Sequence, residues 1–428
     1  MKNPFKPSEI ISDPNEFFGR AHEISALGRL LSQGSVAIQG SFGVGKSSLL
    51  SRVLLHMDGF DSGEVCVYKL AVGHGDIDDI EKAARLVLEE LVSFDTKSQT
   101  LTFGIPKLAQ YSSTEAYALF QEGRHLAALN HILEDKAFRT ALSNGGYFLI
   151  AIDEAEKCAP ALARLFRQVI TKAQLNGIGN IRFVFAGVSP FVEAMIKEDP
   201  GVMRFIYETI DLKPFSMEEA RELLDAKFSL VVESTKALGE DVNVDPGVVD
   251  RIVQLSGGHP HLLQLLGSHV IEHEHANPDG LLDNSDLVGS LQKICYQQRA
   301  PVYDALIHDM RAEARYDAYL ELLGLLGGNF PGQIDVGKAL EEIDKEDVDW
   351  FLSRNILMVT SEHSYEIVDE LLRVRVIMDM YEDYDTLEAE LISHGELIEE
   401  GNVFDQIWGS ALRSTRLFAF EYREDEGA

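Results

Sequence analysis

The sequence predicts an α/β protein in which a core built on a parallel sheet is followed by a helical region and a smaller C-terminal domain. Three observations favour this fold class. Between about residues 35 and 215, short β-rich runs alternate with stretches of helical periodicity, which is typical of a parallel sheet. From 216 to 299 the periodicity is helical throughout and begins with the cap-like segment "SMEEARELL". At about 301–381, short helices precede two β-rich runs in "NILMVTSEHSYEIVDELL", an order that suggests a winged helix.

The length of the chain, 428 residues, exceeds what one hydrophobic core supports, so we expect several domains. In the core, strands are expected at "SVAIQG", "EVCVYKL", "YFLIAID", "IRFVFAG" and "FIYETIDL". Between about residues 75 and 146 we expect a helix, an irregular polar stretch and a second helix. The predicted boundaries are 1–34 for an N-terminal arm and motif, 35–215 for the core, 216–299 for a helical lid, 300–381 for the winged-helix-like domain and 382–428 for an acidic C-terminal extension.

The composition is that of an ordinary soluble globular protein, with 45% hydrophobic and 25% charged residues. The opening "MKNPFKPSEI" lacks the apolar segment of a signal peptide, and no apolar run approaches the ~20 residues that a membrane-spanning helix needs. Three isolated cysteines, Cys66, Cys158 and Cys295, form neither a disulfide framework nor a zinc pattern. We therefore expect a cytoplasmic protein with no membrane contact.

The charge of the chain is strongly acidic and unevenly distributed. The formal net charge is −32, and from residue 300 onward 30 Asp and Glu stand against 10 Lys and Arg, a balance of −20 that leaves −12 for the preceding 299 residues. Such a surface repels a phosphate backbone unless a local basic stripe overcomes it, and the sequence contains no such stripe. Nucleic acid is thus disfavoured as a partner. Two interpretations remain: an acidic surface that serves solubility, or a surface for a basic protein partner.

The segment "VAIQGSFGVGKSSLLSRVLL" at residues 36–55 predicts a phosphate-binding site. It has the spacing G-x-x-x-x-G-K-[ST], after an apolar strand and before a leucine-rich helix. Glycines let backbone N–H groups close around a phosphate, and the start of the helix points its positive dipole end at the anion. Lys46 is expected to reach the β- and γ-phosphates of ATP, and the Ser47 hydroxyl to bind Mg²⁺. The expected nucleotide-binding residues of this loop are Gly40, Ser41, Phe42, Gly43, Val44, Gly45, Lys46, Ser47 and Ser48.

An apolar strand that ends in two acids, "YFLIAIDEAEK", supplies the second half of the expected site. Asp153 is expected to hold the Mg²⁺ shell, and Glu154 to act as the general base that polarises the attacking water. A glutamate in this second position favours hydrolysis, since it would otherwise have no function there. The next strand, "IRFVFAG", leads to Ser189, whose side chain either senses the γ-phosphate or caps the helix that starts near Pro190.

These motifs, in this order, resemble the AAA+/STAND group of P-loop ATPases of the ASCE class. Within that group, the chain is similar to the bacterial and archaeal branch that resembles origin-recognition-type initiator ATPases. The segment "LSGGHPHLLQLLG" resembles the lid motif whose Gly-x-Pro, here Gly258, His259 and Pro260, touches the nucleotide. The closing segment "YEIVDELLRVRVIM" is similar to the end of the family's winged helix. "NPF" followed by "FFGRAHEISALGRLL" resembles a motif that packs beside the adenine, here Phe18, Gly19, Arg20 and Glu23.

The resemblance also implies an arginine that acts across a subunit boundary. In "MRFIYETIDLKPFSMEEARELL" this residue is Arg204, which would serve as a catalytic arginine finger in a homo-oligomer formed in the ATP state. Arg164 and Arg167 are rival candidates for that function. Each of the three can equally be an ordinary surface arginine.

The sequence therefore predicts an ATPase that works as a molecular switch, with ATP and Mg²⁺ bound between core and lid. Its output would be oligomerisation or control of a protein partner, and the resemblance to STAND proteins is compatible with antiphage defence or signalling. A DNA-remodelling or loading ATPase is the second hypothesis, but the helix at "KEDVDWFLSRN" that would read DNA is acidic. A nucleotide-locked scaffold with little hydrolysis is the third, and Glu154 argues against it. The pattern "HVIEH" at 269–273 also matches inverted zinc peptidases, although no third ligand is marked.

Overall fold

The structure is a computed structural model that describes residues 2–56, 66–91, 93–95, 100–105, 109–136, 139–140, 147–239, 241–326, 333–360 and 363–379. The chain divides into two compact units. The core unit is Ile10–Lys213, and the helical unit combines Met1–Glu9 with Pro214–Ala428. The acidic extension predicted at 382–428 lies outside the described residues.

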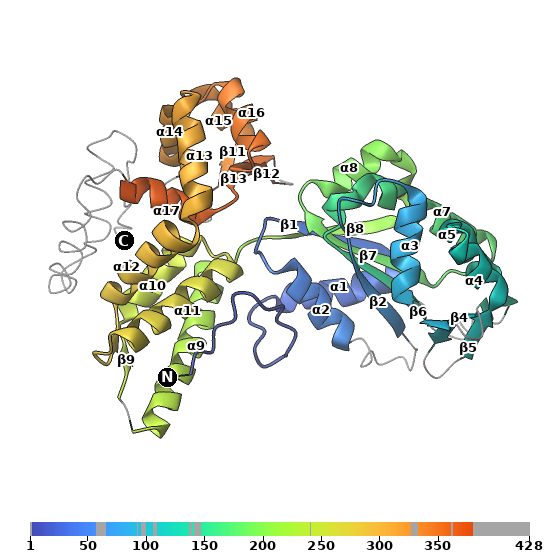
Figure 1. The fold of residues 1–428 in the computed structure, drawn as a ribbon, viewed down its shortest axis with the longest axis horizontal. Helices are drawn as coiled ribbons and strands as arrows, with labels where there is room; N and C mark the ends of the chain where they lie inside the picture. Colours follow the sequence, from blue (N-terminus) through green and yellow to red (C-terminus); the bar gives the residue numbers. More distant parts are fainter. Residues whose placement is uncertain are drawn as a thin grey trace, which may run out of the picture. The chain divides into compact units, whose positions relative to one another are not determined.

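A five-stranded sheet in the order β2-β6-β7-β1-β8 forms the centre of the core unit, and every strand pair in it is parallel (Figure 1). The predicted α/β class with a parallel sheet is thereby confirmed. All five strands expected from the β-rich runs of the sequence are present, at β1 (Ser35–Gly40), β2 (Cys66–Val72), β6 (Tyr147–Asp153), β7 (Ile181–Val188) and β8 (Ile206–Leu212).

Helices cover both faces of this sheet. Successive side chains of a strand point to opposite faces, so the apolar strands present apolar side chains on both faces, and both must be buried. Val36 and Ile38 of β1 pack with residues of α1 (Ala21–Gln33) and α2 (Lys46–His56). Ala37, between them, packs with residues of α3 (Ile80–Leu91) and α7 (Ala159–Leu175) on the other face (Figure 1). The short elements after β6 and β7 are η2 (Ala155–Cys158), α8 (Phe191–Glu198) and η3 (Pro200–Arg204).

The segment between α3 and β6 differs from its prediction. An irregular polar stretch was expected there, and the structure has a three-stranded antiparallel sheet of β3 (Ser93–Asp95), β4 (Thr100–Ile105) and β5 (Ala109–Ser113). Strand β4, "TLTFGI", does alternate polar with apolar residues, a signal that the prediction missed, whereas β3 and β5 are short and lack this pattern. Two helices follow, α4 (Thr114–Gln121) and α5 (His125–Glu134).

The helical unit begins, after the core, with the capping box expected at "SMEEARELL". The Ser216 hydroxyl accepts from the Glu219 N–H at 3.2 Å, and the Glu219 carboxylate accepts from the Ser216 N–H at 3.0 Å. The helices that follow are α9 (Met217–Ala237), α10 (Pro246–Ser256), α11 (Pro260–Ala276) and α12 (Asn284–Lys293), with a small parallel pair of β9 (Asn243–Val244) and β10 (Leu281–Leu282).

The histidines of "HVIEH" lie on α11 and serve packing contacts. Nδ1 of His273 lies 2.8 Å from the Asp286 carboxylate of α12, and Nδ1 of His269 lies 3.3 Å from the Glu272 carboxylate. Within the described ranges, no group of three or more His, Cys, Asp or Glu side chains is arranged to hold a metal ion. In the described part of the chain, His269 and His273 are thus engaged with carboxylates rather than with a third metal ligand.

The last described part contains three short strands among helices. Strands β11 (Gln333–Asp335) and β12 (Leu357–Val359) both pair with β13 (Ser364–Ile367) in an antiparallel sheet. That these elements form a winged helix stays a prediction. Among the described helices, none combines the length and the apolar character that crossing a membrane requires. The helices of this part are η4 (Ile294–Gln298), α13 (Ala300–Ala312), α14 (Tyr316–Leu326), α15 (Val336–Glu342), α16 (Lys345–Ser353) and α17 (Glu370–Asp379).

Candidate nucleotide site

The phosphate loop joins the end of β1 to the start of α2, and its backbone explains its glycines. A Cβ atom on Gly40 would lie 2.3 Å from the backbone oxygen of Leu212 on β8, so no larger residue fits there. Gly43 and Gly45 have φ angles of 72° and 96°, which residues with side chains rarely adopt. The loop therefore closes tightly over the sheet edge, with its backbone amides at the start of a helix.

Two groups in the loop fit a bound phosphate. The Lys46 Nζ donates to the backbone oxygens of Gly40 at 3.0 Å and Ser41 at 2.8 Å, so the lysine side chain bends back over its own loop. The Ser41 side chain is 5% exposed, and its hydroxyl has no hydrogen-bond partner among the described residues. A buried hydroxyl left unpaired costs about 1–3 kcal/mol, a penalty that a phosphate oxygen would remove.

The acidic end of β6 lies at the same sheet edge as the loop. Gly40 of β1 is in register with Val188 of β7, and Ile152 of β6 with Phe185 of β7, so all three parallel strands end together. Asp153 is buried, and its Oδ1 accepts from the N–H of Glu154 at 2.9 Å. Ser47 at the start of α2 is half-buried. Oxygen ligands from a serine and an aspartate are of the kind that Mg²⁺ prefers.

Glu154 stands in a strained turn at the end of β6. Its φ of 52° and ψ of 37° place it in the left-handed region, which costs a residue with a side chain about 1–2 kcal/mol. The N–H of Gly73, after β2, donates to the Asp153 carbonyl at 2.8 Å and helps hold this turn. The Glu154 carboxylate is half-exposed and pairs with the Lys157 Nζ at 2.5 Å, a contact that raises the pKa of Lys157. Strain of this kind is often retained where a side chain has a function.

Glu156 is a residue of the site that the sequence did not identify. Its Oε2 accepts from the backbone N–H of Val188 at 3.0 Å, at the end of β7. A Cβ atom on Gly187 would lie 2.9 Å from the same oxygen, so the glycine makes room for it. The only signal in the sequence was a third acid in "DEAEK", which a solvated helix start explains equally well. Glu156 therefore ties the turn after β6 to the strand that leads to Ser189.

The two interpretations of Ser189 can now be compared. Helix α8 has Pro190 as its N-cap and no side-chain cap, so Ser189 does not cap the helix. Its side chain is 7% exposed, and its hydroxyl has no hydrogen-bond partner within the described part of the chain. Its backbone N–H lies 3.4 Å from the Gly40 carbonyl, next to the phosphate loop. The arrangement leaves this buried hydroxyl available to a ligand at the sheet edge.

Arg20 supports the phosphate loop from the N-terminal motif. It is buried, and one guanidinium nitrogen donates to the Val44 carbonyl at 3.2 Å and also to the Lys213 carbonyl. Its other terminal nitrogen pairs with Glu23 at 3.2 Å. Gly19 and Arg20 both have left-handed φ angles, of 64° and 61°, and this turn directs the arginine inward. Phe18 is half-buried, and contact of this motif with an adenine stays a prediction.

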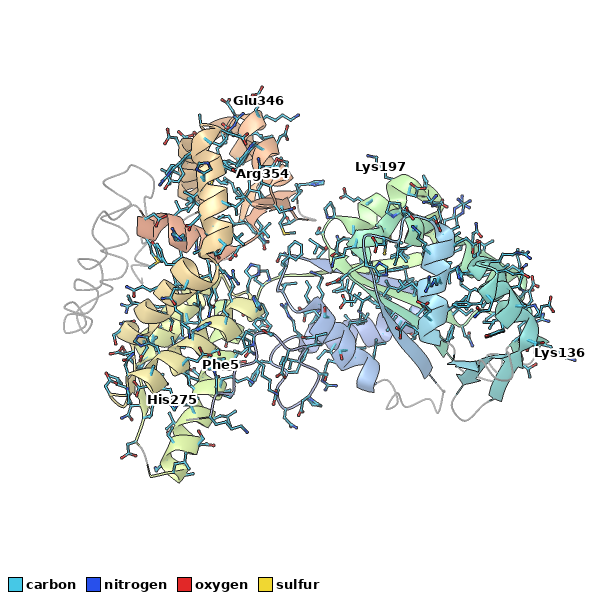
Figure 2. All side chains as sticks on the ribbon, viewed as in Figure 1. Phe5, Lys136, Lys197, His275, Glu346 and Arg354 are labelled. Carbon is cyan, nitrogen blue, oxygen red and sulfur yellow. The ribbon has the colours of Figure 1, made fainter. Side chains whose placement is uncertain are left out.

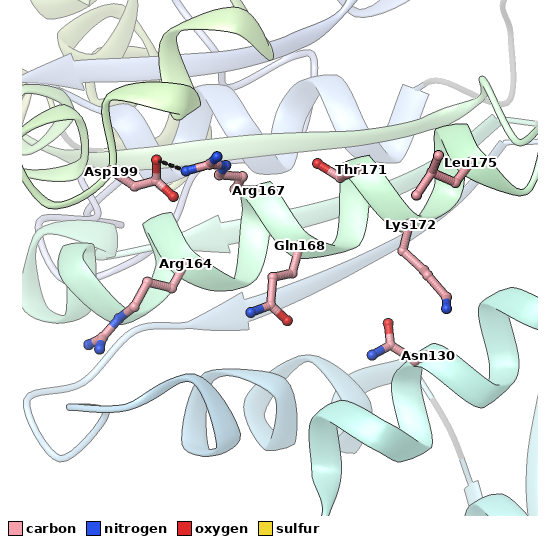
Figure 3. Close-up of a pocket in the computed structure, with 8 residues that line it drawn as sticks. All are labelled: Asn130, Arg164, Arg167, Gln168, Thr171, Lys172, Leu175 and Asp199. Carbon is pink, nitrogen blue, oxygen red and sulfur yellow. Dashed lines mark hydrogen bonds and ion pairs between the residues drawn. The ribbon is translucent and has the colours of Figure 1, made fainter.

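The three candidate arginines differ in their surroundings. Arg167 pairs with Asp199, and Arg164 lies 3.5 Å from the Glu198 carboxylate. Both line a shallow hollow of about 360 Å³ beside α7 (Figure 3). Arg204, in η3, is exposed and has no ion pair or hydrogen bond with the described residues. Among the three, Arg204 is thus the one whose charge is not already engaged.

Pro260 belongs to the helical unit, where it is the first residue of α11. The preceding turn uses left-handed glycines, Gly257 with φ 57° and Gly258 with φ 76°. His259 is buried and its Nε2 lies 3.3 Å from the Glu366 carboxylate of β13. Contacts within the helical unit therefore hold the lid turn in place. A contact between Pro260 and a nucleotide stays a prediction.

The chain is similar to several known proteins. A sequence profile of the family described as Novel STAND NTPase 1 matches residues 9–374. A Walker-type ATPase of Pyrococcus abyssi has a similar structure, with a TM-score of 0.52 and 15% identity over 86% of this chain and 98% of that one. The ADP form of the ORC2 protein of Aeropyrum pernix gives a TM-score of 0.48 and 14% identity over 92% and 98% of the two chains. Curated protein sequences give no match.

Proposed function

Because this chain belongs to the novel STAND NTPase 1 family, a family of P-loop NTPases, we propose that it is an ATP-binding and ATP-hydrolysing switch. One observation carries this proposal. Two buried hydroxyls, those of Ser41 and Ser189, lack hydrogen-bond partners among the described residues, and both stand next to Gly40 at the mouth of the phosphate loop. Unpaired buried polar groups at a helix start are what a phosphate-binding site requires.

In this proposal each residue of the site has a defined task. Backbone amides of residues 40–48 and the Lys46 ammonium bind the phosphates. Ser47 and Asp153 hold Mg²⁺, which neutralises phosphate charge when bound. Glu154 accepts a proton from the attacking water, and the Ser189 hydroxyl donates to a phosphate oxygen. Hydrolysis needs the Glu154 carboxylate to leave the Lys157 ammonium, because its oxygen must then accept a hydrogen bond from the attacking water.

The output of the switch is, in this proposal, control of oligomerisation or of a protein partner. Arg204 supports it, because an exposed arginine without a partner in the described part can reach a neighbouring copy's phosphates. Met203 and Tyr207 beside it are 63% and 56% exposed, which suits a surface that becomes covered. A role in antiphage defence or signalling fits such a switch and is proposed on the family alone.

Purified protein tests this proposal directly. We expect calorimetry to detect ATP binding that strengthens with Mg²⁺, and a phosphate-release assay to detect turnover. Absence of binding at millimolar ATP would refute the proposed function. Tight binding without phosphate release would instead favour the nucleotide-locked scaffold, and turnover stimulated by duplex DNA would favour the DNA-loading ATPase.

A further inference from the structure

The turn after β6 carries two acids that have different partners. Glu154, the proposed general base, precedes η2, and Glu156 is the second residue of η2. The first and last residues of η2, Ala155 and Cys158, are both buried in the hydrophobic core on the α3 and α7 face of the sheet. This short helix is therefore held at both ends, with the half-buried Glu156 between them.

The Glu156 side chain reaches across to the neighbouring strand of the sheet. Strands β6 and β7 are paired in parallel (Figure 1). At the end of β7, the Val188 N–H donates to the Glu156 Oε2 at 3.0 Å. The residue before it, Gly187, leaves the space that this contact needs, because a Cβ atom there would lie 2.9 Å from the same Oε2 and 2.8 Å from the Phe191 ring. The carboxylate thus occupies a site that a larger residue would close.

Val188 connects this contact to the phosphate side of the site. The residue that follows it is Ser189, whose buried hydroxyl has no hydrogen-bond partner among the described residues. The Ser189 N–H lies 3.4 Å from the Gly40 carbonyl of the phosphate loop. A single carboxylate, that of Glu156, therefore links the turn that carries Glu154 to the backbone group directly before Ser189.

We infer that Glu156 is a positioning residue for hydrolysis, which sets the distance between the Glu154 carboxylate and the Ser189 hydroxyl by holding the Val188 amide. This task rests on the proposed function, in which the carboxylate must reach the attacking water while the hydroxyl reaches a phosphate oxygen. A displacement of about 1 Å can lower such a rate about 10²-fold. Glu156 itself touches neither the water nor the phosphate, so it acts on the rate through the backbone of β7.

Substitutions of Glu156 separate the length of the side chain from its charge. Glu156→Gln keeps an acceptor oxygen at the same reach, so its turnover number, kcat, should stay within about threefold of the wild type, the loss expected for a neutral acceptor. Glu156→Asp keeps the charge but is one methylene shorter, so its kcat should fall by about 10–100-fold, as should that of Glu156→Ala. ATP affinity should not change in any of the three, because the phosphate loop is intact. Phosphate release and calorimetry measure the two quantities.

Gly187→Ala breaks the same contact from the other strand and leaves Glu156 in place. Its Cβ would displace the carboxylate, so kcat should fall as in Glu156→Ala. Gly179→Ala is the control, since a Cβ there meets nothing within 4 Å and this exposed residue lies in the loop before β7. If Gly187→Ala does not fold, the comparison of the Gln and Asp variants at position 156 still decides the outcome.

Amide hydrogen exchange of the nucleotide-free protein reports on the contact without any turnover. The Val188 amide should lose protection in Glu156→Ala and Glu156→Asp and keep it in Glu156→Gln and Gly179→Ala. A second test combines Glu156→Ala with Ser189→Ala. If Glu156 acts through Ser189, the double variant should be no slower than the slower single variant, whereas independent effects on the rate would multiply.

Three results would overturn the positioning role of Glu156. The first is a Glu156→Ala protein that has lost protection of the Val188 amide and still turns over ATP as the wild type does. The second is a Glu156→Gln protein as slow as Glu156→Ala, which would make the charge or the proton of Glu156 essential. The third is multiplied effects in the double variant with Ser189→Ala. Each of these leaves the proposed function standing, whereas a wild-type protein that neither binds nor hydrolyses ATP would overturn both.

Discussion

At the residue scale, Lys46 is the only charged residue in the phosphate loop, residues 40–48. Lys46→Ala should therefore abolish measurable ATP binding, because no other side chain of the loop can neutralise phosphate charge. Calorimetry with ATP and Mg²⁺ measures this. Lys197→Ala, at an exposed position of α8, is the matched control and should bind normally. An affinity of Lys46→Ala within twofold of wild type would mean that the loop is not the site.

Glu154 can be tested separately from binding. Glu154→Gln keeps the size of the side chain but cannot accept a proton from water, so turnover should fall by about 10²–10⁴-fold while ATP still binds. The measurement is phosphate release under single-turnover conditions, with calorimetry for binding. Glu193→Gln on the exposed face of α8 is the control. Unchanged turnover would assign the base to another residue.

Local spacing identified some of these residues and could not identify others. Asp153 and Glu154 follow an apolar strand directly, so the sequence alone is sufficient to single them out. Glu156 and Arg20 act through backbone groups that are distant in sequence, the Val188 N–H and the Val44 and Lys213 carbonyls. A tertiary contact to a backbone atom leaves no pattern in the side chains that surround it. The structure was needed to find Glu156, and to show that Arg20, which the sequence had already singled out, holds the phosphate loop.

At the scale of elements, helix α16 has an acidic outer face, on which the exposed Lys345 at its first position stands against Glu346, Asp347 and Asp349. Arg315 is paired with Asp347 of the helix, and Arg354 is paired with Asp309 and Glu313. Figure 2 labels Arg354 and Glu346 in this part of the chain. Arg354 also lies over the Trp350 ring, 5.2 Å from its centroid. Glu346 and Asp349 remain on the exposed side. With the neighbouring arginines engaged and its carboxylates outnumbering Lys345, this helix repels a DNA backbone on balance.

We therefore expect no measurable binding to duplex DNA at physiological salt. Fluorescence anisotropy with a labelled duplex, Mg²⁺ and ATP measures it at low and at physiological salt. The variant Glu346→Lys with Asp349→Lys serves as a positive comparison, because reversing both charges should create weak, salt-sensitive binding. Tight binding by the wild-type protein that weakens steeply with salt would promote the DNA-loading hypothesis over the switch.

Strands of the core were predictable and those of the insertion were not, for a physical reason. A parallel strand buried on both faces is a nearly continuous apolar run, as in β6 and β7, and such a run is conspicuous in a sequence. The small sheet of β3, β4 and β5 depends on pairing among its own short strands. Strand β4 alternates polar and apolar residues, but β3 and β5 do not, so the sequence of the sheet as a whole is inconspicuous.

At the scale of the whole molecule, the function of Arg204 determines whether one copy of the chain can hydrolyse ATP by itself. If it completes a neighbour's site, specific activity must rise with protein concentration, since an arginine supplied in trans contributes about 10³–10⁵ in rate in P-loop enzymes. Phosphate release over a wide dilution series measures this, with light scattering on ATP-bound Glu154→Gln protein to detect assembly.

The matched control is Arg29→Ala, which removes another exposed arginine, on α1. It should behave as the wild type does, whereas Arg204→Ala should lose activity at every concentration while still binding ATP. A flat dilution curve at full activity would show a self-sufficient monomer, and Arg204 would then have no part in catalysis.

The N-terminal residues Asn3–Phe5 pack against helices α9 and α11 of the helical unit, and this contact implies an order of events during synthesis. Asn3 is synthesised 265 residues before its partner Ser268. At a translation rate of about 5–20 residues per second, Ser268 is made roughly 13–53 s after Asn3. The core unit ends at Lys213, before Ser268 is made, so the core can fold while Phe5 still lacks its partners in the helical unit. Packing of these N-terminal residues on the helical unit is consequently a late step of folding. Before this step, the apolar Phe5 side chain of the nascent chain is open to aggregation or to binding by a chaperone.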